Sequence, residues 1–324
     1  MTKIDLITGI LGSGKTTFIK KYASHLIAKG ERIAILENDF GAVNVDMMIL
    51  QDLKCDNCTI EMIMGGGDHD CHRRRFKTQL ISLGMQNYDR VIVEPSGIFD
   101  MDEFFDLLYE SPLDRWFTIG SVIGITDSET DDVLSEQMEY LLASESSCCG
   151  KLVVSKLKSD SDKEQITEKL LSHINRELEN IQCDRRLTQN DMIAVMFDDL
   201  DTAYLDQLEN AGYRASRYVK KFSPEQIKSA VHYFMHISIA EEKIKTVIEN
   251  IINDSGCGKI FRIKGSLPKE NGKWLKVNAT KEKTELAEVE NGQPVLIAIG
   301  DDMCREKIDE YLKEFNTDSE YVSI

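Results

Sequence analysis

Short runs of apolar residues alternate along the first two thirds of the chain with segments in which apolar residues recur every three or four positions. The runs have the length of buried strands, and the segments between them have the spacing of amphipathic helices. This alternation predicts a parallel sheet that is covered by helices on both faces. The expected strands are 3–7, 32–36, 91–93, 117–125, 151–154 and 193–197, and the expected helices are 16–29, 71–83, 101–109, 130–142, 163–178 and 203–210.

The pattern changes near residue 220, where strand-like segments begin to follow one another with few helices between them. We therefore divide the chain into an α/β domain over residues 1–220 and a smaller α+β domain over residues 221–324. The smaller domain is expected to have an antiparallel sheet of the ferredoxin-like kind. Its expected strands are 231–240, 259–264, 274–278, 285–289 and 294–299, and its expected helices are 241–253 and 305–315.

The connection between the first strand and the first helix carries the clearest chemical signal. It matches the pattern G-x-x-x-x-G-K-[ST] directly after a strand, which is the context in which such a loop holds a nucleoside triphosphate. The glycines let backbone N–H groups turn toward one anion, and the helix N-terminus adds partial positive charge. We expect Lys15 to bind the β- and γ-phosphates and the Thr16 hydroxyl to bind Mg²⁺. The predicted nucleotide-binding residues of this P-loop are Gly9, Gly12, Ser13, Gly14, Lys15, Thr16 and Thr17.

Acidic residues follow two further strands, at the sheet edge where ligands of parallel sheets bind. Asp39 follows the second expected strand and Glu94 follows the third. Either carboxylate is placed to hold Mg²⁺ or to orient an attacking water, so the predicted catalytic residues are Lys15, Asp39 and Glu94. Gly97 lies just beyond Glu94, where its N–H is placed to contact the γ-phosphate.

Composition narrows the class of partner and the compartment. The 324 residues carry a net charge of −17 and a pI near 4.9, which argues against nucleic-acid and anionic membrane surfaces as partners. No apolar run approaches the roughly 20 residues of a membrane span, and the first strand begins too early to leave room for a signal peptide. The eight cysteines then indicate thiols or metal ligands in a reducing compartment. We expect a cytoplasmic protein.

The chain resembles the CobW family of GTP-binding proteins, which belongs with the HypB and UreG metallochaperone GTPases. The resemblance rests on three ordered motifs, GILGSGKTT at 9–17, NDFG at 38–41 and EPSG at 94–97, and extends to FRIKG at 261–265 and VLIAIG at 295–300. It implies a slow GTPase that uses Mg²⁺, binds Zn²⁺ or Co²⁺, and delivers the metal to a client metalloprotein or a cofactor-biosynthesis enzyme. A homodimer is one assembly that the sequence leaves open.

The family's Cys-x-Cys-Cys metal motif is altered in this chain. Placing its last cysteine on Cys71 puts Asp68 and Asp70 where the other two cysteines would stand. These carboxylates are metal-ligand types, and His69 and His72 lie beside them. A site of carboxylate and imidazole with a single thiolate would be hard and open, and could suit cobalt, nickel or iron.

A second ligand set uses a C-x-x-C pair just upstream, Cys55 and Cys58. Together with Cys71 and either His69 or His72, this pair would make a four-ligand site of thiolate and imidazole, which favours zinc. A redox disulfide between Cys55 and Cys58 is a lesser alternative. The remaining alternative is an exposed loop in which the ligand residues are incidental.

The family's guanine-reading motif, Asn-Lys-x-Asp, is replaced by Ser155, Lys156, Leu157 and Lys158. Lys156 is retained and is expected to lie along the base and ribose. Lys158 has only hydrogen-bond donors, so it cannot accept from the guanine N1–H and amino group as an aspartate does. Asp160 stands two positions late, and the preference between GTP and ATP is left open.

Two functions from different classes follow from these motifs. The first is a GTP-binding and GTP-hydrolysing metallochaperone, in which the order of the loop 55–72 depends on the nucleotide. The alternative is a metal-independent nucleotide switch or binding module that has lost the family metal motif. A small-molecule kinase on the same core is a third possibility.

Overall fold

The computed structural model describes residues 1–10, 12–38, 50–63, 69–95, 101–130, 134–223, 231–281 and 283–323. The chain divides into two compact units, Met1–Pro224 and Glu225–Ile324. Among the described residues, no helix has both the length and the apolar content needed to cross a membrane.

The first unit is built on a seven-stranded sheet in which all neighbouring strands run parallel. The predicted parallel α/β architecture is therefore confirmed. The central strands β1 and β4 are almost wholly buried because both of their faces are covered. The strands are β1 (Thr2–Thr8), β2 (Ile33–Asn38), β3 (Cys58–Ile63), β4 (Arg90–Pro95), β5 (Phe117–Asp127), β6 (Lys151–Ser155) and β7 (Met192–Ala194).

The strand order of this sheet is β3-β2-β4-β1-β5-β6-β7. The chain first builds the side of the sheet that holds β2, β3 and β4, and then crosses β1 to build the side that holds β5, β6 and β7. Ligands of open α/β sheets bind beyond the carboxyl ends of the strands, at the point where the strand order reverses in this way. The carboxyl end of β1 is that point.

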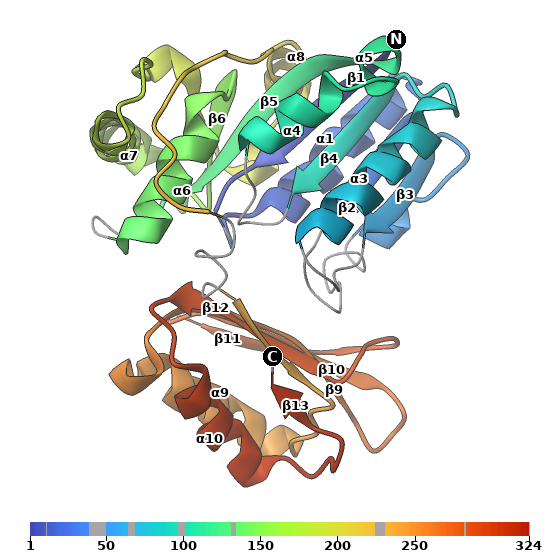
Figure 1. The fold of residues 1–324 in the computed structure, drawn as a ribbon. Helices are drawn as coiled ribbons and strands as arrows, with labels where there is room; N and C mark the ends of the chain where they lie inside the picture. Colours follow the sequence, from blue (N-terminus) through green and yellow to red (C-terminus); the bar gives the residue numbers. More distant parts are fainter. Residues whose placement is uncertain are drawn as a thin grey trace. The chain divides into compact units, whose positions relative to one another are not determined.

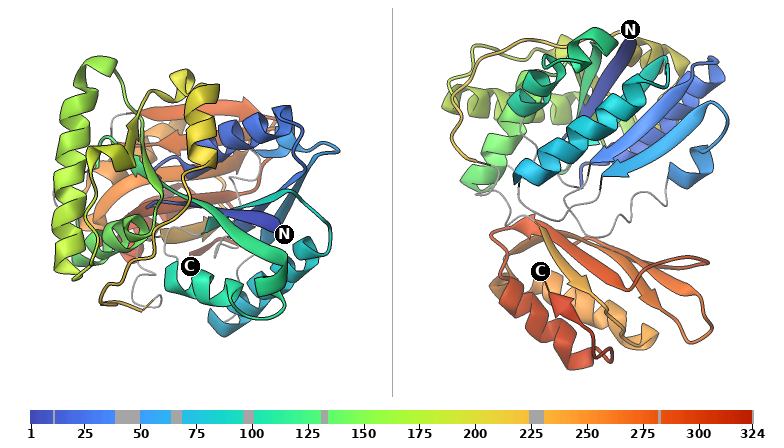
Figure 2. Two further views of the ribbon diagram at one scale, coloured as in Figure 1. Left: turned by 90° about the horizontal axis from the view of Figure 1, so that it is seen from above. Right: turned by 45° about the vertical axis from the view of Figure 1, so that its right-hand side comes forward.

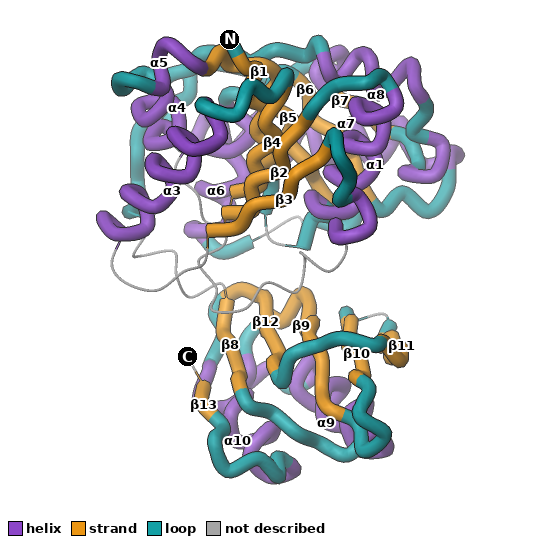
Figure 3. Tube along the Cα trace, turned by 90° about the vertical axis from the view of Figure 1, so that its right-hand side faces the viewer, coloured by secondary structure: helices purple, strands orange, loops and turns teal. Residues whose placement is uncertain are grey.

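Helices cover both faces of the sheet. Their bounds are α1 (Lys15–Ala28), α3 (His69–Gly84), α4 (Met101–Leu108), α5 (Leu113–Trp116), α6 (Glu136–Ser147), α7 (Lys163–Asn180) and α8 (Thr202–Glu209). In Figures 1 and 3, α3, α4 and α6 lie on one face, and α1 and α8 lie on the other.

The helix α1 is held against the sheet by its apolar face. Phe18, Ile19, Tyr22 and Leu26 recur at helical spacing, are fully buried, and pack in one core with strand residues such as Ile35. Fully burying a side chain of this size contributes about 1.5–3 kcal/mol relative to leaving it exposed. This packing fixes the position of the first turn of α1, which follows the glycine-rich loop directly.

The edge strand β3 was absent from the strands predicted from the sequence. It lacks a continuous apolar run, because Cys58, Ile60 and Ile63 are buried while the residues between them are partly exposed. This half-covered pattern is the one expected of a strand with only one neighbour. Its register places Cys58 opposite Ile33 in β2.

Several predicted boundaries also differ from the structure. The helix predicted over 130–142 is α6, which begins only after Ser135, whose hydroxyl accepts a hydrogen bond from the Met138 N–H as an N-cap. The strand predicted over 193–197 ends at Ala194. The strand predicted over 231–240 ends at Met235.

The second unit is a six-stranded antiparallel sheet, with helices packed on one face (Figure 2). Its elements are β8 (Val231–Met235), α9 (Glu241–Asn253), β9 (Lys259–Pro268), β10 (Trp274–Ala279), β11 (Thr284–Val289), β12 (Val295–Asp301), α10 (Arg305–Phe315) and β13 (Val322–Ser323). The strand order is β11-β10-β9-β12-β8-β13, so β12 lies between β8 and β9 and is antiparallel to both. This split β-α-β arrangement confirms the predicted ferredoxin-like kind of domain, here extended at one edge by the β10–β11 hairpin.

Candidate functional site

The glycine-rich loop follows β1 and is curled by glycines in conformations that other residues rarely adopt. Gly9, Gly12 and Gly14 have φ angles of 139°, 81° and 100°. A Cβ atom on Gly9 would lie 2.2 Å from the carbonyl oxygen of Ile125 in β5, so the loop packs directly on the neighbouring strand. The glycines are therefore required by the backbone, as the motif predicts. Leu11 lies outside the described residues.

The first turn of α1 presents the residues that the motif predicts for binding phosphate. Lys15 is 6% exposed, and its ammonium donates to the carbonyl of Gly9 at 2.6 Å and to that of Ile10 at 3.4 Å. Gly14 is the N-cap and has no side chain to occupy the free amides of this turn. These amides are therefore available to an external anion. Thr17 is exposed on the same turn.

A carboxylate from the neighbouring strand reaches the threonine of the loop. The Thr16 hydroxyl lies 3.2 Å and 3.1 Å from the two carboxylate oxygens of Glu94, which is buried near the end of β4. Hydroxyl and carboxylate oxygens are ligands that Mg²⁺ accepts beside nucleotide phosphates. Thr16 and Glu94 therefore fit a Mg²⁺ site. Asp39 and Gly97 lie outside the described residues.

The end of β6 contacts the loop from the other side. The Ser155 hydroxyl donates to the carbonyl of Ser13 at 2.5 Å and lies 3.2 Å from that of Thr126. Ser155 stands where the family motif has asparagine, and it ties this strand end to the loop. The sequence places Ser155 at the end of an apolar run but gives no signal that its hydroxyl contacts the loop.

The side chains of the two lysines that follow β6 both form ion pairs. Lys156 has a positive φ of 56°, and its ammonium lies 2.5 Å from a carboxylate oxygen of Asp127 at the end of β5. Lys158 lies at the same distance, 2.5 Å, from a carboxylate oxygen of Glu129. Sequence reasoning missed both acidic partners. They place negative charge beside the residues that the resemblance assigns to the base.

The predicted metal ligands fall at two different places in the first unit. Cys58 is 1% exposed at the start of β3, and Cys55 is exposed beside it, joined to it by a pair of backbone hydrogen bonds of 3.3 Å and 3.0 Å. Cys71 is half-buried in the first turn of α3. The side chains of His69, Asp70 and His72, and all of Asp68, lie outside the described residues.

The structure does not bring Cys58 and Cys71 together. At about 3.3 Å per residue, β3 carries the chain roughly 16 Å from Cys58 toward the carboxyl edge of the sheet. The helix α3 returns from there, because Gly84 at its end packs on Trp116 and Phe117, where β5 begins. Cys58 therefore lies at the amino edge and Cys71 at the carboxyl edge, on the side of the glycine-rich loop.

Thiol reactivity tests this placement. Burial, and to a lesser extent the neighbouring Cys55, raise the pKa of the Cys58 thiol to about 11. We expect iodoacetamide to alkylate Cys55 at least about a hundredfold faster than Cys58 in the folded protein at pH 8. Mass spectrometry of timed samples measures both rates, and a urea-unfolded sample is the control in which the two should react alike. Similar rates in the folded protein would contradict the buried position of Cys58.

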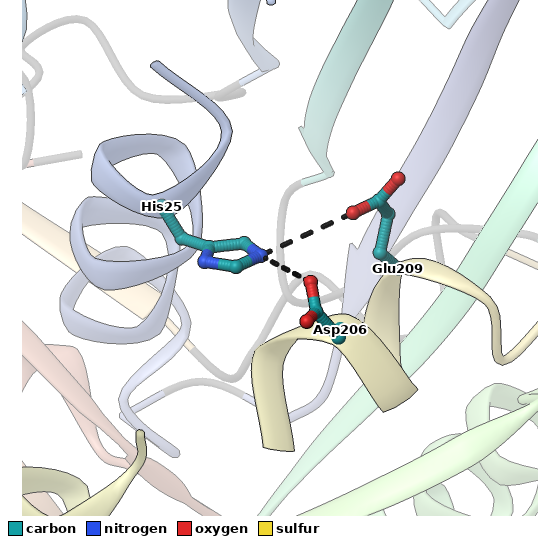
Figure 4. A group of neighbouring side chains, drawn as sticks. All are labelled: His25, Asp206 and Glu209. Carbon is teal, nitrogen blue, oxygen red and sulfur yellow. Dashed lines mark hydrogen bonds and ion pairs between the residues drawn. The ribbon is translucent and has the colours of Figure 1, made fainter. Parts of the chain in front are cut away.

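Two further groups among the described residues bring potential metal ligands within 4.8 Å of one another. In the first, drawn in Figure 4, His25 Nε2 lies 3.1 Å from Asp206 and 4.0 Å from Glu209. The ammonium of Lys29 contacts the same two carboxylates, at 3.0 Å and 2.5 Å. Cations of the protein already pair with both carboxylates, since the Arg90 guanidinium also lies 3.2 Å from Glu209, so this group acts as a contact between α1 and α8.

The second group joins α6 and α7. His173 Nε2 lies 2.6 Å from Glu139. The two carboxylate oxygens of Glu177, one turn further along α7, accept from Arg176 at 2.6 Å and from Asn180 at 2.7 Å. Here too the carboxylates are hydrogen-bonded within the protein, which is how a buried polar contact between helices is stabilised.

A parallel sheet with a glycine-rich loop, a lysine and a threonine between its central strand and the following helix defines a P-loop nucleoside-triphosphate-binding protein. The model of one family, described as the CobW/HypB/UreG nucleotide-binding domain, matches residues 3–184. This is more than half of the chain, and the chain belongs to that family. The family resemblance predicted from the ordered motifs is confirmed.

Several relatives of known name are similar to parts of this chain. The zinc chaperone YeiR of Escherichia coli K12 is 33% identical over 128 residues, which cover 39% of this chain and 38% of that protein. The zinc chaperone YjiA of the same organism is 26% identical over 179 residues, covering 52% and 53%. The chain thus spans about half or less of the length of these relatives. A crystal structure of Zn(II)-bound YjiA GTPase from E. coli covers 98% of this chain and 99% of its own, with 15% identity and a TM-score of 0.39.

Proposed function

We propose that this protein binds and slowly hydrolyses GTP, and that it couples the state of the nucleotide to the binding and delivery of a transition metal, zinc before cobalt. The observation that carries the proposal is the contact between the Thr16 hydroxyl and the Glu94 carboxylate beside the curled glycine-rich loop. This contact joins the end of β4 to the loop after β1, so that loop amides, a lysine and a pair of oxygen ligands suited to Mg²⁺ lie together at the carboxyl edge of the sheet. Family membership and the zinc chaperones among the relatives support the choice of nucleotide and metal.

The proposed hydrolysis needs positioning and charge neutralisation rather than a covalent intermediate. The loop amides from Gly12 to Lys15 orient the phosphates, and Lys15 binds the β- and γ-phosphate oxygens. Thr16 and Glu94 would hold Mg²⁺, which when bound offsets negative charge on those oxygens. Asp39, Gly97 and Lys156 are proposed to orient water, contact the γ-phosphate and lie along the base.

The proposed transition-metal site is centred on Cys71. This thiol lies at the carboxyl edge of the sheet, as the loop does, and is flanked in sequence by Asp68, His69, Asp70 and His72. Thiolate, imidazole and carboxylate are the ligand types that zinc accepts. Because Cys55 and Cys58 lie at the opposite edge, we do not include them in the proposed site. A client metalloprotein or cofactor-biosynthesis enzyme in the cytoplasm would receive the metal.

One titration tests nucleotide coupling and metal site together. Zn²⁺ is added to the protein with Mg²⁺, in the presence and absence of a non-hydrolysable GTP analogue, and binding is followed by competition with a chromogenic chelator. We expect Cys71→Ser to weaken zinc binding at least about tenfold, since it removes a thiolate ligand. The matched control, Cys55→Ser, changes an exposed thiol at the other edge and should bind as the parent does. The analogue should change the zinc affinity of the parent.

The metal-independent switch is the second candidate. Two observations favour it: the family cysteine positions carry Asp68 and Asp70, and Cys58 is a core residue distant from Cys71. Under this alternative, GTP is bound and hydrolysed but the same titration shows no stoichiometric zinc binding. That outcome would rule out the metallochaperone, while GDP formation that requires an added acceptor, with the phosphoryl group transferred to that acceptor, would point to a kinase.

A further inference from the structure

The helix α6 carries a buried carboxyl group that no step of the proposed hydrolysis uses. Glu145 is 3% exposed, and within the described part of the chain neither of its carboxylate oxygens makes a hydrogen bond of ordinary length and angle, although the Gly9 amide of the loop approaches the carboxyl. Leaving a buried polar group without a partner costs about 1–3 kcal/mol. Such a group calls for a specific explanation.

A chain of contacts places this part of α6 against the base of the glycine-rich loop. The Cys149 thiol donates to the backbone carbonyl of Glu145 at 3.0 Å. The same sulfur lies 2.8 Å from where a Cβ on Gly124 would stand, and Gly124 pairs with Thr8 at the end of β1. Thr8 directly precedes the loop. Its hydroxyl and those of Ser13 and Thr126 are also buried, with no hydrogen-bond partner among the described residues.

Burial and two groups of the loop have opposite effects on the charge of Glu145. Burial raises the pKa of this carboxyl to about 8, although the Lys15 ammonium and the Gly9 amide both favour its charged form. Among the described residues, the thiols of Cys148 and Cys149 also interact with Glu145, and burial raises their pKa values far enough to keep both thiols neutral. Burial therefore favours the neutral form of the Glu145 carboxyl near pH 7, and we expect the carboxyl to ionise as the pH rises through about 8.

We propose that Glu145 is a positioning residue of the nucleotide site. When Glu145 is protonated, the Lys15 ammonium can bind the phosphates; when Glu145 is ionised, its carboxylate attracts that ammonium away from them. The proposal rests on the proposed nucleotide binding. It implies that protonation of Glu145 strengthens nucleotide binding at the loop, and that nucleotide binding strengthens protonation of Glu145.

The physical reason lies in the present contacts of Lys15. Its ammonium donates to the carbonyls of Gly9 and Ile10 inside the loop, and it must leave them to bind a phosphate. An ionised Glu145 would attract this ammonium through a medium of low dielectric and would repel the triphosphate. A bound triphosphate in turn raises the affinity of Glu145 for its proton. Nucleotide affinity should accordingly fall as the pH rises through about 8, the value to which burial shifts the carboxyl.

The test compares nucleotide affinity at pH 7 and pH 9 by titration with a fluorescent GTP analogue in the presence of Mg²⁺. We expect the parent to lose about tenfold in affinity between these values, since each pH unit above the carboxyl pKa weakens a proton-linked ligand about tenfold at most. Glu145→Gln, which keeps the shape but cannot ionise, should lose less than about twofold. The matched control is Glu136→Gln, the same change at an exposed position of α6, which should behave as the parent does.

An unchanged pH dependence in Glu145→Gln would overturn the inference. If that variant does not fold, calorimetry of the parent at pH 8.5 in buffers of different ionisation enthalpy decides: proton uptake on binding supports the inference, and no uptake overturns it. Tight binding that does not change with pH also overturns only this inference. Absence of nucleotide binding by the parent at pH 7 overturns the proposed function and this inference together.

Discussion

Replacing Lys15 with alanine is expected to lower the affinity for GTP and for ATP by at least about a hundredfold, or roughly 3 kcal/mol. Lys15 supplies the mobile positive charge of the loop, and charge-assisted hydrogen bonds to phosphate are about twice as strong as neutral ones. Its side chain is buried against the loop that it serves, and its ammonium donates to the carbonyl of Gly9.

Lys20→Ala is the matched control, because Lys20 lies on the same helix and its ammonium forms an exposed ion pair with Asp52. Such a surface pair is worth about 0–1 kcal/mol, so this variant should bind nucleotide as the parent does. Titration calorimetry with both nucleotides and Mg²⁺ measures the two variants. If Lys15→Ala binds them as tightly as the parent, the glycine-rich loop is not the phosphate site.

Replacing Arg90 with alanine is expected to lower the free energy of unfolding by about 3–5 kcal/mol, the range for breaking a buried ion pair from one side. Arg90 is wholly buried in β4, and its guanidinium lies 2.6 Å from Asp5, 3.2 Å from Glu31 and 3.2 Å from Glu209. Asp5 is equally buried and also accepts from the Tyr22 hydroxyl at 2.7 Å. Without Arg90, the Asp5 carboxylate stays in the core with no cation beside it.

Urea unfolding followed by circular dichroism measures this loss. Arg217→Ala is the control: its side chain is 95% exposed and pairs with Asp184 at the surface, so its effect should stay within about 0.5 kcal/mol. A double variant, Asp5→Asn with Arg90→Met, should lose less unfolding free energy than the sum of the losses of the two single variants. In each single variant one charged group stays buried without its partner, whereas the double variant removes both charges. An Arg90→Ala protein as stable as the parent would show that the cluster does not hold β1, β4 and α8 together.

Sequence reasoning located the elements whose pattern is set locally. The apolar runs of β1 and β4 and the helical spacing of Phe18, Ile19 and Tyr22 are visible in the sequence because both faces of the sheet are covered. The glycines of the loop were equally clear, since Gly9 and Gly14 are dictated by backbone conformation at their own positions. The helices α9 and α10 were predicted with the bounds that the structure has.

What escaped prediction depends on partners that are distant in the sequence. The strand β3 has only one neighbour, so its apolar pattern is too weak to separate it from a loop. Cys58 was interpreted with Cys55 because of their spacing, although the length of β3 separates it from Cys71. Nothing local marks Glu145 as buried or Arg90 as the centre of a charge cluster, because both properties arise only when helices from elsewhere cover those positions.

The Ser155 hydroxyl gives the nucleotide site a mechanical property. Ser155 belongs to the segment that would face the base. Its hydroxyl donates a hydrogen bond of 2.5 Å to the backbone carbonyl of Ser13, which belongs to the loop that would bind the phosphates. The base and the phosphates of a bound nucleotide would thus contact two segments that are joined by this hydrogen bond. A misfit at the base would be transmitted as a displacement of the loop, so discrimination between bases would appear in the rate of hydrolysis as well as in affinity.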